Sequence, residues 1–179
     1  MEDAPSGLQL IADFVNTADL DEDREDLSDP AALRHWLGEH DLLPAGATVA
    51  ETDLERALEV REAIRALLLA NNGAPLDQDA VATLNRAAEA ARLAVRFADD
   101  GHAELVPSEQ GVPGALARIL GLTYTAMADE TWPRLKACRD HACMWAFYDS
   151  SKNRSRTWCS MQTCGNRTKA RAYRERRRG

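Results

Sequence analysis

The alternation of apolar and polar positions predicts mostly helices in the first 133 residues. Asp29 followed by Pro30 is an N-cap signal, and it begins a helix through DPAALRHWLGEHDLL. The segment TDLE at 52–55 is a capping box before LERALEVREAIRALLLA, and the Asn-Asn-Gly sequence at 71–73 ends that helix. Two more helices are expected, over about 78–91 and about 112–128.

A β-hairpin is expected between the last two helices, in the segment RLAVRFADDGHAELVP. Leu93, Val95 and Phe97 alternate onto one face, and the Asp100-Gly101 pair in the centre favours a tight turn. The predicted fold class is therefore α+β, with a mainly helical N-terminal domain that contains a β-hairpin.

Two arginines lie on or beside the apolar face of the second helix. Arg61 falls inside the arc of leucine, valine and isoleucine positions, and Arg65 lies near its edge. A charge on a core-facing surface needs a partner, so an internal ion pair or an arginine that extends to the rim is one interpretation. The other is a pocket in which Arg61 and Arg65, together with Asn16 of the DFVNT segment, bind a small anionic molecule.

Charge divides the chain into two parts. Hydrophobic residues make up 45% of the 179 residues and charged residues 28%, which is typical of a globular protein. Residues 1–133 hold 9 basic and 26 acidic residues, a net charge of −17, whereas residues 134–179 hold 13 and 3, a net charge of +10. This asymmetry indicates two domains, the second a candidate for binding nucleic acid, although the basic part could instead dock on the acidic body.

The chain shows neither a basic, apolar leader sequence nor a stretch approaching the roughly 18 apolar residues of a membrane span. We therefore expect a cytoplasmic protein without a membrane partner.

All four cysteines lie in the basic part, as two C-x4-C pairs separated by fifteen residues. Cytosolic thiols stay reduced, so clustered cysteines favour a metal site over disulfides. The two pairs can deliver four sulfurs to one tetrahedral zinc ion, with an iron–sulfur cluster as the alternative. His141, inside the first pair, is expected to be a bystander.

The sequence around the cysteines predicts a small fold organised by the metal. MWAFYD is expected to form a short aromatic strand, and TKARAYRERRR a helix that begins just after Cys164. Two ligands from a turn and two from the start of a helix suggest a treble-clef-like zinc finger that ends in a basic helix.

The predicted terminal helix carries a continuous basic face. Arg167, Arg171, Arg174 and Arg178 are spaced i, i+4, i+7 and i+11, and arginine outnumbers lysine eight to two in residues 152–179. Such close like charges repel one another, so a polyanion is their natural partner, and planar guanidinium groups suit phosphate well. A solvated basic tail is the alternative interpretation.

Catalytic signals are weak. His35, His40 and His102 are scattered along the body, and the chain has neither a glycine-rich phosphate loop nor a GxSxG motif. We therefore expect that the protein is not an enzyme.

Two segments resemble known families. CRDHACMWAFYDSSKNRSRTWCSMQTCGNRTKARAYR resembles the CGNR zinc-finger family, named for the tetrapeptide found here at 164–167. DFVNT at 13–17, the helix at 29–37 and the hairpin resemble ABATE, a stress-linked domain usually found with that finger. The resemblance implies a bacterial transcription regulator with a DNA-contacting finger and a body that binds a small ligand.

The resemblance also implies roles for individual residues. One structural Zn²⁺ is expected, and its ligands are Cys138, Cys143, Cys159 and Cys164. The resemblance makes Arg167 and the arginines after it candidates for contact with DNA, although Arg167 could instead serve the finger's own structure. With the other basic residues of the finger, the expected nucleic-acid-binding set is Arg154, Arg156, Arg167, Lys169, Arg171, Arg174 and Arg178.

Two positions depart from the family pattern. Family members often have a second arginine where this chain has Thr157, and often glycine where it has Met144. We expect the first difference to remove one phosphate contact and the second to change packing.

The sequence as a whole predicts a two-part regulator that binds DNA mainly through phosphates. The acidic body is also expected to compete with DNA for the finger. Two other classes stay open: an RNA- or ribosome-associated zinc protein, and a protein–protein adaptor with a purely structural zinc. The sequence also leaves open whether the protein is a homodimer.

Overall fold

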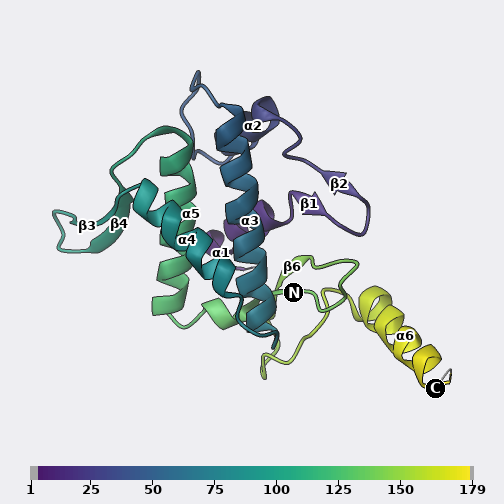
Figure 1. Cartoon of the computed structure of the whole chain (residues 1–179). Helices are drawn as coiled ribbons and strands as arrows, with labels where there is room; N and C mark the ends of the chain where they lie inside the picture. Colours follow the sequence, from purple (N-terminus) through teal and green to yellow (C-terminus); the bar gives the residue numbers. More distant parts are fainter. Residues whose placement is uncertain (1–3, 178–179) are drawn as a thin grey trace.

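A computed structural model describes residues 4–177, which form six α-helices and three two-stranded antiparallel sheets (Figure 1). Within these residues, none of the helices combines the length and the apolarity needed to cross a membrane. The elements in chain order are α1 Ser6–Val15, β1 Ala18–Asp19, β2 Arg24–Glu25, α2 Pro30–Glu39, α3 Glu51–Asn71, α4 Gln78–Ala90, β3 Leu93–Phe97, β4 Ala103–Pro107, α5 Gly111–Ala128, β5 Leu135–Ala137, β6 Ala146–Tyr148 and α6 Asn166–Arg176.

Helix α3 is the centre of the body. It packs against α1, α2, α4 and α5, and α4 crosses it diagonally in Figure 1. The core is filled by apolar side chains from these helices, among them Phe14, Leu37, Ile64 and Leu116, each with at most 1% of its surface exposed. Burying each such side chain stabilises the fold by roughly 1.5–3 kcal/mol, so the apolar faces of these helices together hold the body in place.

The predicted α+β class is confirmed, and most helix boundaries follow local signals. Asp29 accepts a hydrogen bond from the Ala32 N–H at 2.8 Å, as expected of an N-cap residue before Pro30. The capping box predicted at 52–55 is wrong, because α3 already begins at Glu51. Its first turn is instead closed by Asp53, whose carboxylate accepts the Ala50 N–H at 3.0 Å.

The predicted hairpin is formed by β3 and β4, with Val95 paired to Leu105. Strand β4 packs on α5, and the far end of the hairpin projects from the body in Figure 1. As a result Val95 and Phe97 stay 61% and 72% exposed. Alternation therefore identified the strands, but it did not show that their outer half lies beyond the core.

The sheet β5–β6 joins the C-terminal segment to the body. Leu135, Ala137 and Ala146 are buried in the same apolar core as the helices. The expected boundary between residues 1–133 and 134–179 therefore falls within one continuous packing unit. Helix α6, in contrast, extends away from the body (Figure 1).

Candidate metal centre and basic helix

The four cysteines meet at one point. Their sulfur atoms all lie within 4.8 Å of one another, and Cys159 Sγ is 3.6 Å from Cys143 Sγ and 3.7 Å from Cys164 Sγ. A tetrahedral zinc ion with Zn–S bonds of about 2.3 Å places its sulfurs about 3.8 Å apart. Cys138, Cys143 and Cys164 are buried, so the cluster can hold one zinc ion largely shielded from water.

Local backbone structure shapes each of the two cysteine pairs. Cys138 directly follows β5, and the chain then turns so that the Cys143 N–H donates to the Asp140 carbonyl at 2.8 Å. Cys164 lies in a π-helical turn, Met161–Gly165, whose start is capped by the Ser160 side chain. The turn leads directly into α6, so the predicted ligand at a helix start and the treble-clef-like order of elements are both found.

A cation is needed for all four sulfurs to ionise. The neighbouring Cys143 and Cys159 thiols lower the pKa of Cys138. The proximity of the Cys138 sulfur in turn raises the pKa of Cys143 and of Cys159. Thiolates are the ligand form, so a bound zinc ion supplies the positive charge that holds four of them together.

Aromatic residues of the finger pack around the metal centre, as the sequence predicts. Phe147 is buried with the cysteines, and Trp145 and Trp158 pack against them. Arg156 lies over the Phe147 ring at 5.1 Å from its centroid and donates to the Cys159 carbonyl at 2.8 Å. Arg156 therefore has a structural role inside the finger.

A buried ion pair that the sequence analysis missed fixes the loop at 150–157. Lys136 Nζ lies 2.7 Å from Asp149 Oδ2 and also donates to the Arg154 and Arg156 carbonyl oxygens. Burial would raise the pKa of the Asp149 carboxyl, but hydrogen bonds from Lys136, Ser151 and the Arg156 N–H outweigh burial and lower that pKa to about 2. The lysine in the short strand before Cys138 was the only sequence signal for this pair.

The backbone at Met144 accounts for the glycine that family members often have at this position. Its φ of 48° lies in the left-handed region, where a side chain is strained and glycine is favoured. The substitution of methionine for glycine was expected to change packing, and it also places a side chain on a backbone conformation that glycine adopts more readily.

Asn16 and Arg65 hold the finger against the body. The Asn16 side chain accepts the Ala146 N–H at 2.7 Å and donates to the Ala146 carbonyl at 3.0 Å, as a neighbouring strand would. Arg65 is 1% exposed and donates to the carbonyl oxygens of Val15 at 2.7 Å and Met144 at 3.0 Å. Both side chains thus form hydrogen bonds within the protein. The role of Asn16 and Arg65 in ligand binding stays a prediction.

Arg61 forms an internal ion pair, which was one of the two interpretations of its position on the helix. Its guanidinium binds both carboxylate oxygens of Glu25, at 2.6 and 2.7 Å, and also bonds to Glu62. Burial would raise the pKa of the Glu25 carboxyl, but the hydrogen bonds from Arg61 and from the Leu27 N–H outweigh burial and lower that pKa. The buried charge is therefore compensated within the protein.

Basic residues cluster on α6. Lys169, Arg171 and Arg174 are exposed, although Arg171 Nη2 lies 3.6 Å from Asp140 Oδ1. Arg167 is half-buried at the start of the helix and bonds to two carboxylates, Asp140 and Asp21. The remaining candidates for contact with nucleic acid are Arg154, which is exposed on the loop at 150–157, Arg156, which is held inside the finger, and Arg178, which lies outside the described residues.

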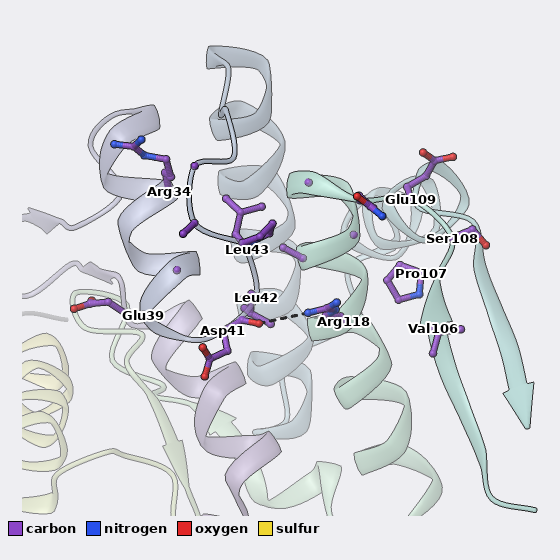
Figure 2. Close-up of a pocket in the computed structure, with 18 of the residues that line it drawn as sticks. Arg34, Glu39, Asp41, Leu42, Leu43, Val106, Pro107, Ser108, Glu109 and Arg118 are labelled. Atoms are coloured by element: carbon purple, nitrogen blue, oxygen red, sulfur yellow. Dashed lines mark hydrogen bonds between the residues drawn. The ribbon is translucent and has the colours of Figure 1, made fainter. Parts of the chain in front are cut away.

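The body has a separate open groove of about 1350 Å³ between α2, the following loop, the hairpin and the start of α5 (Figure 2). Arg118 reaches from α5 to the Asp41 carbonyl at 3.4 Å, the hydrogen bond drawn in Figure 2. Arg34 and Arg96 also line the groove. None of Asn16, Arg61 and Arg65 lines it.

Comparison with known families agrees with both resemblances. Residues 8–131 match ABATE, described as "Putative stress-induced transcription regulator", and residues 134–177 match the CGNR zinc finger. Comparison with curated proteins gives no match. The two family descriptions concern regulation and zinc binding rather than an enzymatic activity.

Proposed function

Because the chain belongs to the ABATE family and carries a CGNR zinc finger, we propose that it is a transcription regulator that binds DNA through its zinc-dependent C-terminal part. The ligands of the single zinc ion are Cys138, Cys143, Cys159 and Cys164. The regulator works in the cytoplasm, where these thiols stay reduced.

The observation that carries the proposal is the exposed basic surface of α6. From Arg167 to Arg177 the helix region holds six basic residues and one acidic residue, Glu175. Because α6 follows the π-helical turn that holds the metal ligand Cys164 and extends away from the acidic body, it is accessible to a duplex. Guanidinium groups bind phosphate oxygens through paired hydrogen bonds, so Arg171 and Arg174 are placed to hold the DNA backbone.

The proposal is tested with the zinc-loaded protein and a fluorescent DNA duplex. Replacing Arg171 and Arg174 together by alanine is expected to weaken binding about tenfold or more at low salt. It should also flatten the dependence of log K on log salt by about 1.8, because each phosphate contact contributes about 0.9. The matched control replaces two exposed body arginines, Arg86 and Arg96, which changes net charge equally.

Two outcomes would favour the other function classes. If structured RNA competes with the duplex at far lower concentration, the protein is an RNA-binding zinc protein. If the wild-type protein binds neither nucleic acid, the zinc finger belongs to a protein–protein adaptor. Selection of bound fragments from a random DNA pool then tests whether the regulator reads a sequence or only phosphates.

We also propose that the body senses a small ligand in the groove of Figure 2. The groove is large enough for a small molecule, and Arg118 has one long hydrogen bond there. A thermal-shift screen of small carboxylates and phosphates should therefore give stabilisation that Arg118→Ala abolishes and Arg61→Leu retains. If a ligand still stabilises Arg118→Ala but no longer stabilises Arg61→Leu, the ligand binds at Arg61 in the interior of the body instead of in the groove.

A further inference from the structure

The acidic loop between β1 and β2 lies against the start of α6. Asp19, at the end of β1, accepts hydrogen bonds from the N–H groups of Asp21 at 3.1 Å and Glu22 at 3.2 Å, which fixes the shape of the loop. From this turn Asp21 reaches Arg167, and their closest atoms, Oδ1 and Nη1, are 2.6 Å apart. The body and the basic helix thus share an ion pair between residues 146 positions apart.

Arg167 uses all three of its nitrogens within the protein. Nε donates to the carboxylate of Asp140, Nη1 donates to Asp21, and Nη2 lies 3.6 Å from the Cys164 sulfur. Asp140 is 0% exposed and belongs to the turn between two cysteines, so its bond to Arg167 is part of the finger. Asp21 is 32% exposed and lies on a surface loop, so its bond is the one that an outside anion can replace.

The buried arginine network of the body holds this loop in place. Glu25, on the returning strand β2, is bound through both carboxylate oxygens by Arg61. Arg61 and Arg65 both bond to Glu62, and Arg65 in turn bonds to the Met144 carbonyl of the finger. The same network therefore sets the position of the acidic loop and of the finger, which keeps Asp21 opposite Arg167.

We propose that Asp21 is an intramolecular competitor that occupies the Nη1 edge of Arg167 in place of a DNA phosphate. This inference rests on the proposed DNA-binding function. Carboxylate and phosphate oxygens accept the same guanidinium hydrogen bonds, so DNA gains this contact only when the loop is displaced. The neighbouring carboxylates of Glu22 and Asp23 add repulsion toward an approaching duplex. The acidic body thus lowers DNA affinity at one defined contact while Lys169 and Arg174 stay exposed.

The test compares Asp21→Asn with Asp23→Asn in the full-length, zinc-loaded protein. Asp23 is the matched control because it lies in the same loop, changes charge equally, and forms no ion pair in the part of the chain that the structure describes. Its φ of 50° is also well tolerated by asparagine. Both variants are titrated against one DNA duplex at several salt concentrations.

Asp21→Asn is expected to bind the duplex about three- to tenfold more tightly than Asp23→Asn at low salt. Its salt dependence should be steeper by about 0.9, which corresponds to one additional phosphate contact. Asp21→Glu, which keeps a carboxylate, should bind like the wild type. Equal affinities and equal slopes for Asp21→Asn and Asp23→Asn would overturn the inference.

A second measurement separates this inference from the proposed function. Without DNA, amide hydrogen exchange in residues 166–171 should be faster in Asp21→Asn than in Asp23→Asn, because the ion pair at the start of α6 is lost. If none of the proteins binds DNA, both the proposed DNA-binding function and the proposed competition by Asp21 are refuted. If all bind equally, DNA binding stands and only the role of Asp21 is refuted.

Discussion

The substitution Asn16→Ala tests how much the Asn16 side chain contributes to docking the finger on the body. It removes the acceptor for the Ala146 N–H at 2.7 Å and the donor to the Ala146 carbonyl at 3.0 Å. Ala146 is only 2% exposed, so water cannot readily replace either partner. Leaving a buried polar group without a partner costs about 1–3 kcal/mol, so the two together should lower the free energy of unfolding by about 2–6 kcal/mol.

The assay is urea unfolding of the zinc-loaded protein, followed by zinc release to a chelator. The unfolding midpoint should fall without a change in slope, and zinc should be released faster because the docked backbone and the metal site fold together. Asn16→Asp should be at least as destabilising, since it places a carboxylate oxygen against the Ala146 carbonyl. The control is Asn153→Ala, an exposed asparagine of the finger whose loss should change stability by less than about 0.5 kcal/mol.

The reasoning would be refuted if Asn16→Ala and Asn153→Ala had the same unfolding midpoint. Asn16 would then contribute nothing to docking, and the alternative prediction, a role in binding an anionic ligand, would become the stronger one. A large loss of stability without any effect on zinc release would contradict only the coupling between body and finger.

Three further predictions concern the finger. Cys164→Ser should abolish one-to-one zinc binding, measured by metal analysis, and should also lower the melting temperature of the body, because Leu135 and Ala146 share its core. Asp149→Asn should lower the free energy of unfolding by about 2 kcal/mol at pH 7, because folding lowers the pKa of this carboxyl from 3.8 to about 2. The difference between variant and wild type is measured from urea midpoints. It should be complete above about pH 4 and become smaller below that pH, where the carboxyl takes up a proton. Met144→Gly should raise the free energy of unfolding by up to about 1 kcal/mol by relieving a φ of 48°, and an unchanged or lower thermal midpoint would contradict this.

The sequence by itself determined the features that depend on neighbours in the chain. Asp29 caps a helix because its carboxylate reaches the N–H of a residue three positions later. The Asp100-Gly101 turn forms because glycine accepts a φ of 82°. The cysteine spacing likewise predicted a zinc site, since each pair lies within one turn and only the approach of the two pairs depends on the fold.

The tertiary structure alone decided what the buried and boundary polar residues do. Periodicity placed Arg61 on a core-facing surface, but its partner Glu25 is 36 positions away and on a different element. Helical spacing placed Arg167 on the same face as Arg171, which left open whether it contacts DNA or serves the finger's own structure. Only the folded chain brings Asp140 and Asp21 to that guanidinium, from 27 and 146 positions away. A hydrogen bond forms only between groups that lie close together in space. The local sequence therefore does not show which distant carboxylate lies next to a given arginine after folding.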